Sequence, residues 1–261
     1  MKKYTPPAAW TVILSGLLFV FACNKSGRPP YPANAAGLCP IKEVIFSTSL
    51  GMDTITFLYD GLGRPVNTTA TIVEDGIPRY QFRYDGQGRL KDYIGVVRGY
   101  SADSWTRYTY SADNRTIWDT TYTVVPEDTT WPPNLHYGSM FTHVKKYDRE
   151  GRVIQIITPI IPPIVYPDTI ITETIQNITY DSRGDVEGFV YDDKINYHQT
   201  NKVWMQINDQ YSVNNPLGTG KYIYDRYGLP VQFADALFLQ ATGFGAIEYG
   251  CDLSKGLATA K

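Results

Sequence analysis

The sequence predicts an all-β fold, an antiparallel meander of roughly ten to fourteen strands that forms a curved sheet or a closed or partly closed barrel. Two observations lead to this prediction. Apolar and polar residues alternate with period two over many short segments, and one turn signature recurs between these segments. Many of the 21 tyrosines fall in the apolar columns of this pattern. The only helical element that we expect is a short turn near Ala234–Leu239.

The recurring signature, called the turn motif below, is Tyr-Asp, two variable residues, Gly and a basic residue, followed by an apolar strand. It occurs at Tyr59–Arg64, Tyr84–Arg89 and Tyr147–Arg152, and more loosely at Tyr110–Arg115, Tyr180–Asp185 and Tyr224–Leu229. We expect the Asp to cap a type I turn and the Gly to take the left-handed conformation of a bulge that closes a hairpin. The predicted turn-forming pairs are Asp60 with Gly63, Asp85 with Gly88, Asp148 with Gly151, Asp181 with Gly184, and Asp225 with Gly228.

The predicted strands begin at Ile41–Ser47 and end at Gly245–Tyr249. In the second strand, Ile55, Phe57 and Tyr59 fall on one side, and the alternation recurs at 80–84, 107–110 and 221–224. An aromatic column backed by Thr or charged residues is typical of a half-buried antiparallel sheet. Glu74–Gly76 is expected to be a return turn. Later units have longer connections, for which we predict loops at 124–137 and 158–168, the second because its four prolines do not suit a central strand. A stretch from Asp192 to Gly220 interrupts the repeat.

The first residues of the chain indicate export. Lys2 and Lys3 precede an apolar run of roughly a dozen residues, and 1–22 is interpreted as a signal peptide. The run ends in Val20–Cys23, which resembles a bacterial lipobox, so we expect Cys23 to be lipidated. Residues 23–38 are then the lipidated cysteine and a flexible tether rich in Pro, Gly and Ala. An ordinary secretory signal with an incidental cysteine, or an uncleaved anchor, remains open.

Lipidation places the protein in the cell envelope, anchored to a membrane that we expect to be the outer membrane. Asn24–Ser26 lack the acidic run typical of surface-exported Bacteroidetes lipoproteins, so the periplasmic and cell-surface faces both stay open.

The two remaining cysteines, Cys39 and Cys251, bracket the predicted strands. In an oxidising compartment such an even pair favours a disulfide, which would join the ends of the fold, and the alternative is two unpaired buried thiols. We interpret residues 39–254 as a single all-β domain and 255–261 as a C-terminal tail.

The turn motifs resemble the YD repeats of Rhs-type proteins, whose consensus is a Tyr-Asp turn followed by Gly-Arg and an aliphatic residue. In those proteins many copies form a shell around a toxic C-terminal segment, and this chain is too short for such a shell. The layout also resembles small Bacteroidetes lipoproteins with a cysteine near each end, a likeness carried by Tyr191–Asn196 and Tyr211–Pro216. Some relatives of that group are described as a domain of unknown function with a porin-like fold. The resemblance implies a curved or closed sheet and no known activity. A membrane-spanning sheet is disfavoured because the columns behind the aromatic residues carry Arg83, Arg107 and Lys221.

A search for catalytic chemistry gives no constellation. Neither Gly-x-Ser-x-Gly nor Ser-x-x-Lys occurs, and the three histidines lack the spacing of zinc ligands. Asp192 and Asp193 do not match the spacing of a calcium loop. The formal net charge is −2 and no Lys/Arg stripe is present, which disfavours nucleic acid as a partner. We therefore expect no catalytic residues, no metal and no cofactor.

The functional expectation is a membrane-anchored, non-catalytic binding or envelope-structural module. It contacts membrane lipid through acylated Cys23, and its further partner would be a glycan or an envelope protein. Trp131, in the Pro-flanked 124–137 loop, is the best candidate for an exposed aromatic contact. One alternative is a component related to Rhs shells that acts in secretion or intercellular competition. Another is an envelope glycan hydrolase, which would need two carboxylates to converge in a cleft.

Overall fold

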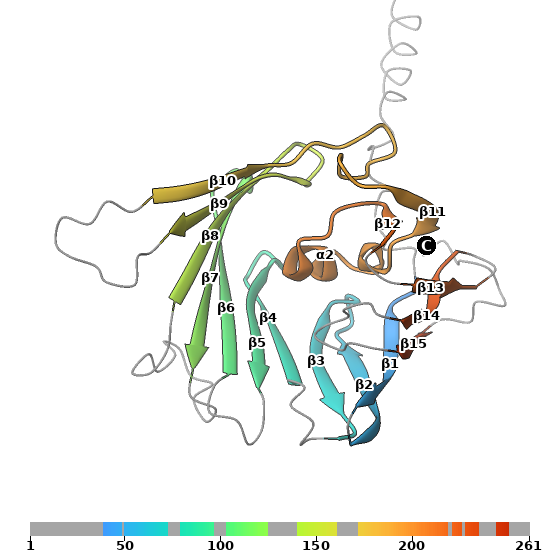
Figure 1. Ribbon diagram of the computed structural model, residues 1–261. Coiled ribbons are helices and arrows are strands. Elements are labelled where there is room, and N and C mark those ends of the chain that lie inside the picture. Colours follow the sequence, from blue (N-terminus) through green and yellow to red (C-terminus); the bar gives the residue numbers. More distant parts are fainter. Residues whose placement is uncertain are drawn as a thin grey trace, which may run out of the picture. The chain divides into compact units, whose positions relative to one another are not determined.

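We obtained a computed structural model that describes residues 39–48, 50–72, 79–96, 103–124, 140–160, 172–218, 221–225, 228–234 and 244–250. These residues form an all-β fold with one curved antiparallel sheet of 13 strands and a separate sheet of two strands (Figure 1). The fold class predicted from the sequence is therefore confirmed. The expected turn at Ala234–Leu239 lies mostly outside the described residues.

The large sheet is a meander in which ten consecutive strands are neighbours. In chain order these are β1 (Ile41–Thr48), β2 (Gly51–Tyr59), β3 (Pro65–Ala70), β4 (Arg79–Tyr84), β5 (Leu90–Val96), β6 (Asp103–Tyr110), β7 (Thr116–Val124), β8 (Met140–Tyr147), β9 (Val153–Ile160) and β10 (Thr172–Asn177). The chain then leaves the sheet, forms the two-stranded sheet of β11 (Tyr191–Ile195) and β12 (Asn214–Pro216), and returns.

Three last strands join the sheet beside the first one. They are β13 (Lys221–Tyr224), β14 (Pro230–Ala234) and β15 (Phe244–Tyr249), and β15 pairs antiparallel with β1. The strand order runs from β10 through β1 and β15 to β13, and these two terminal strands are not paired with each other in the described part of the chain. The sheet is thus open.

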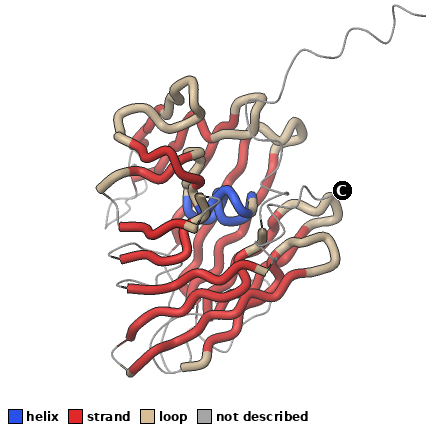
Figure 2. The backbone as a smooth tube through the Cα atoms, turned by 90° about the vertical axis from the view of Figure 1, so that its right-hand side faces the viewer, coloured by secondary structure: helices blue, strands red, loops and turns tan. Residues whose placement is uncertain are grey.

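One face of the sheet, called the inner face below, packs against the only long irregular insertion in the meander that the described ranges contain. This insert, residues 178–218, carries the 3₁₀ helix η2 (Tyr197–Thr200) and the helix α2 (Lys202–Asn208), and Figure 2 shows the helical segment lying against the strands. Trp204 of α2 contacts Phe57 and Phe82 edge to face, with ring centroids 5.3 and 5.6 Å apart. Burial of each such ring stabilises the fold by about 2 kcal/mol or more.

The opposite, outer face carries a smaller buried cluster of Ile94 and Trp105, against which Tyr122 packs. Its polar part is the buried Asp92, which accepts hydrogen bonds from the Trp105 indole (3.0 Å) and the Arg107 guanidinium (2.7 and 3.1 Å). The charged column that the sequence places behind the aromatic residues is therefore partly buried and paired. Burial of these ions is tolerated because the carboxylate and the guanidinium are both hydrogen-bonded.

Two segments differ from the sequence-based expectation. The predicted 158–168 loop begins later, since Thr158–Ile160 belong to β9 and Pro159 lies opposite Glu173 of β10. β10 is the terminal strand of the sheet, so the missing N–H of Pro159 affects the ladder only near its edge. The helices of the insert were not predicted. The 124–137 loop lies, apart from Val124, outside the described residues.

Candidate functional site

The turn motifs have one common backbone geometry. At the glycine position φ is positive: 73° at Gly63, 78° at Gly88, 80° at Gly151, 90° at Gly184 and 83° at Gly228. Asn114 takes the same place in the looser copy with φ 58°, which asparagine tolerates better than other non-glycine residues.

In the copies that begin at Tyr59, Tyr84, Tyr147 and Tyr180, the motif aspartate closes the turn with both of its oxygens. In the first copy, Asp60 Oδ1 accepts from the backbone N–H groups of Leu62 (2.9 Å) and Arg64 (3.0 Å), and Oδ2 accepts from Arg64 Nε at 2.8 Å. Asp85 with Arg89 and Asp148 with Arg152 repeat the ion pair. Hydrogen bonds from Arg64 are the main cause that lowers the pKa of Asp60, so the turn keeps its carboxylate ionised.

The motif tyrosine and arginine link neighbouring units. Tyr84 donates its hydroxyl to the carbonyl of Pro65 (2.7 Å), and Tyr110 donates to the carbonyl of Leu90 (2.5 Å). The guanidinium of the preceding motif stacks over each ring, Arg64 over Tyr84 at 4.4 Å. Further copies of the hydroxyl contact join Tyr59 to Ile41, Tyr180 to Val153 and Tyr249 to Pro230, and further stacks join Arg89 to Tyr110 and Arg152 to Tyr180. In these copies the motif residues therefore join one hairpin to its neighbour.

The insert docks directly on these turns. Asn201 caps α2 by accepting from the N–H of Val203 (3.0 Å), and its Nδ2 donates to the carbonyl of Gly63 (3.1 Å). Gln206 Nε2 donates to the hydroxyl of Tyr110 at 3.1 Å. The helix is consequently held at the turn end of the inner face.

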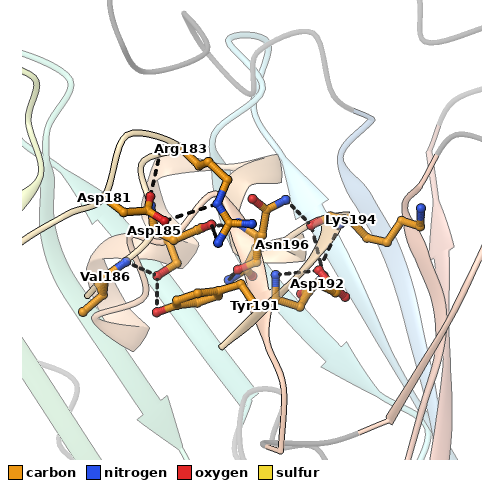
Figure 3. A network of polar contacts seen from close by, with 11 residues as sticks. Asp181, Arg183, Asp185, Val186, Tyr191, Asp192, Lys194 and Asn196 are labelled. Carbon is orange, nitrogen blue, oxygen red and sulfur yellow. Dashed lines mark hydrogen bonds and ion pairs between the residues drawn. The ribbon is translucent and has the colours of Figure 1, made fainter. Parts of the chain in front are cut away.

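The two insert segments that carried the resemblance to Bacteroidetes lipoproteins pair with each other, as β11 and β12. Asp192 Oδ1 accepts from the N–H groups of Lys194 (3.0 Å) and Asn215 (3.1 Å), and its Oδ2 accepts from the hydroxyl of Tyr224. Asp185 accepts from the N–H of Asn214 at 2.8 Å. Figure 3 shows these carboxylates drawn together with Asp181 and Arg183 of the preceding turn. The acids of this region thus bind backbone and tyrosine groups of the protein itself.

A cavity of about 530 Å³ lies between the first motif turns and the helices of the insert, and we call it the turn groove. Its volume falls within the range of about 300–1,000 Å³ that is usual for ligand pockets. Pro40 borders it. The motif side contributes Leu62, Gly63, Arg64, Tyr84, Gly88, Arg89, Leu90 and Tyr110, and the insert contributes Thr200, Asn201, Lys202, Val203 and Gln206.

The turn groove combines apolar walls with a few hydrogen-bond donors. Arg64 uses Nε and Nη2 on Asp60, while its Nη1 points to the neighbouring turn, 3.1 Å from where a Cβ on Gly88 would stand. Lys202 is exposed and forms no ion pair with any residue that the structure describes. Burial raises the pKa of Tyr110 to about 12, so its hydroxyl stays a neutral donor. A bound molecule would meet an apolar surface with Lys202 as its unpaired charge.

An ionic cluster holds the far end of α2 on the sheet. The side chain of Lys145, on β8, is almost fully buried. Its ammonium contacts Asp119 (2.5 Å) and Asp209 (2.6 Å), and Asp209 is the C-cap residue of α2. Asp119 also bonds His143 Nδ1 at 3.0 Å. That bond raises the pKa of His143, and the charges of Asp209 and Asp119 outweigh burial and raise the pKa of Lys145. Nearby, Tyr147 departs from the inter-unit contact, and its hydroxyl pairs with that of Tyr211 at 3.0 Å.

Of the residues singled out by sequence, Cys23, Trp131 and Cys251 lie outside the described residues. Cys39 is buried and disulfide-bonded. The N–H of Gly250 donates to the carbonyl of Pro40 (2.8 Å), so the chain positions next to 39 and 251 are adjacent. The Cys39–Cys251 pairing stays a prediction that this geometry suits.

Two features are absent from the described residues. These residues contain no group of three or more His, Cys, Asp or Glu arranged to hold a metal ion. No helix among them has the length and hydropathy needed to cross a membrane.

Sequence reasoning missed the turn groove because it missed α2. The helix has seven residues, too few for a helical period to stand out. The signal that could have located it is Asn201, a preferred N-cap residue, before a run containing the helix formers Lys, Met and Gln.

Comparison with known proteins gives a structural likeness. No family model and no curated protein matches the chain. A solved porin-like protein from Bacteroides vulgatus is similar in structure, with a TM-score of 0.40 and 13% sequence identity over 81% of this chain and 99% of that one. The YD-repeat assignment remains an interpretation of the motifs.

Proposed function

We propose that this chain is a lipid-anchored protein of the bacterial cell envelope whose β domain binds a ligand without transforming it. The anchor is acylated Cys23, and the domain faces the periplasm or the cell surface. The observation that carries the binding function is the turn groove, a cavity of about 530 Å³ lined on one side by repeated motif residues and on the other by the non-repeated insert.

The lining of the groove defines what suits it. Leu62, Tyr84 and Val203 offer apolar contact, and Arg64 and Lys202 offer donors for hydrogen bonds. A ligand with an apolar face and several oxygen acceptors therefore fits best. A glycan and a segment of an envelope protein both have these properties, and they are the partner classes that we propose.

The placement of the carboxylates supports binding over hydrolysis. No Asp or Glu is among the described residues that line the turn groove, and a glycoside hydrolase uses two such groups. The motif acids Asp60 and Asp85 are paired with Arg64 and Arg89. Asp119, Asp209 and their lysine form a cluster that fastens the insert.

The experiment is a binding comparison between two tryptophan variants of a soluble form that starts at Asn24. Gln206→Trp places an indole in the turn groove, whereas Thr174→Trp places one on the exposed strand β10. The probe is anilinonaphthalene sulfonate, which has an apolar body and oxygen acceptors. We expect Gln206→Trp to weaken binding about tenfold, a loss of about 1.4 kcal/mol, and Thr174→Trp to leave it unchanged. Equal affinities in the two variants would rule out the groove as the binding site.

The anchor is tested separately. Cys23→Ala should move the protein from the membrane fraction to the soluble fraction, because the thiol that carries the acyl chain is lost. Ser26→Ala, three residues away, should remain in the membrane fraction. Membrane association of Cys23→Ala at the level of Ser26→Ala would contradict lipidation.

A further inference from the structure

A second cavity, of about 190 Å³, lies within the insert and beside β13. We call it the amide cavity, because carboxamide side chains dominate its lining. Among others, Asn208, Gln210 and Asn215 supply carboxamides, and His198, Tyr197 and Tyr222 supply rings. It shares no lining residue with the turn groove.

The lining of the amide cavity is electrically neutral. None of its lining residues is Asp, Glu, Lys or Arg. His198 is buried, and burial lowers its pKa to about 3, so the imidazole is uncharged at neutral pH. Asn196 Oδ1 accepts from the backbone N–H of His198 (3.0 Å), which fixes the orientation of the Asn196 amide. The imidazole Nδ1, 2.8 Å from the same oxygen, must therefore carry the hydrogen of the neutral ring. Nε2 of the imidazole is therefore an acceptor.

Several polar groups of this lining have no hydrogen-bond partner among the residues that the structure describes. Asn208 Nδ2 donates to the carbonyl of Trp204 (2.9 Å), and no described residue donates a hydrogen bond to Asn208 Oδ1. Asn215 Nδ2 donates to the carbonyl of Ile195 (3.0 Å), and Asn215 Oδ1 likewise accepts no hydrogen bond from a described residue. The side chains of Gln210 and Tyr222 make no hydrogen bond within the described ranges. The cavity lining therefore presents both hydrogen-bond donors and acceptors, all of them uncharged.

Two tyrosine rings form part of the wall. The centroids of Tyr197 and Tyr222 are 6.3 Å apart and their planes are inclined by 50°. A tyrosine ring combines an apolar face with a polar hydroxyl. A ligand here can therefore place C–H groups against a ring and hydroxyl groups against the carboxamides.

We propose that the amide cavity binds a single neutral sugar ring, whether a free monosaccharide or the terminal residue of a glycan. Sugar hydroxyls donate and accept hydrogen bonds, as carboxamides do, and the C–H face of the ring packs on tyrosine. The cavity is smaller than the roughly 300 Å³ at which pockets for drug-sized ligands begin, which suits one ring. The inference rests on the proposed function as a non-catalytic binding domain, but it uses a separate cavity.

The test is saturation-transfer NMR on the soluble form starting at Asn24, with glucose, galactose, mannose and N-acetylglucosamine as probes. At least one should receive saturation, and glucuronate should bind more weakly than glucose because the cavity offers no cation. Gln210→Ala should weaken binding about fivefold, the effect of one lost hydrogen bond, and the matched variant Gln176→Ala on exposed β10 should not. Tyr222→Phe, which keeps the ring, provides a second variant with the same expected direction.

The probes also separate the two sources of a sugar ring. β-linked disaccharides that bind as well as the monosaccharides would assign the cavity to a glycan end, and binding of monosaccharides alone would assign it to free sugar. No saturation of any of the four sugars, or equal affinities in Gln210→Ala and Gln176→Ala, would overturn the inference. If anilinonaphthalene sulfonate still binds Gln206→Trp more weakly than Thr174→Trp, the proposed function survives that failure.

Discussion

Lys145 is the residue whose replacement most sharply tests how the insert is held on the sheet. Its side chain is 5% exposed, and its ammonium contacts two carboxylates at 2.5 and 2.6 Å. Lys145→Met keeps the aliphatic stem but leaves Asp119, also 5% exposed, with His143 as the remaining partner of this cluster. Removing one member of a buried ion pair costs about 3–5 kcal/mol. We expect the lower end, about 3 kcal/mol, because the Asp209 side chain is 40% exposed and can be hydrated.

The measurement is the free energy of unfolding from urea titration, and the chain offers a matched control. Lys146 is the next residue on β8 and is exposed, so Lys146→Met should change the free energy by less than about 0.5 kcal/mol. Asp209→Asn should lie between the two, since Asp119 still neutralises Lys145. Free energies of unfolding of Lys145→Met and Lys146→Met that differ by less than about 1 kcal/mol would show that this cluster does not hold the insert.

Three further predictions concern single groups. Gly63→Ala should cost about 1–2 kcal/mol of folding free energy because φ is 73°, whereas Gly61→Ala in the same turn should be nearly neutral; equal costs in urea titration would contradict the left-handed turn. Asp119 raises the pKa of His143, so the stability from this pair should be complete below about pH 6.5 and fall as pH rises through the raised pKa. His143→Gln should remove this pH dependence of the free energy of unfolding. A variant with the same pH profile as the wild type would show that His143 does not cause the dependence. Mass mapping of non-reduced peptides should find Cys39 joined to Cys251, and a different partner for Cys39 would refute the pairing.

The fold could be predicted because its information is local. A type I turn with an aspartate cap and a left-handed glycine is specified within six residues, and Tyr59–Arg64 or Tyr84–Arg89 can be recognised without any partner. Period-two alternation then places Phe57 and Phe82 on one face. These local signals were enough for the all-β class, the meander and most strand positions.

The contacts between units could not be predicted because they depend on register. That Arg64 stacks on Tyr84, and that Tyr84 reaches the carbonyl of Pro65, follows from how β3 and β4 lie beside each other, which no single motif encodes. The turn groove was harder still to predict from the sequence. Its second wall is a seven-residue helix held by tertiary contacts of Trp204 and Asp209, and propensity alone does not determine so short a helix.

The central claim, that the turn groove is the ligand site, is tested most directly by backbone amide NMR of the soluble form titrated with anilinonaphthalene sulfonate. Gly63 and Gly88 line the groove, whereas Gly151 has the same motif geometry and φ of 80° but lies outside it. If the turn groove binds the probe, the amide signals of Gly63, Gly88 and Val203 should shift and that of Gly151 should not. Shifts at Gly151 as large as those at Gly63, or shifts confined to other parts of the sheet, would contradict it.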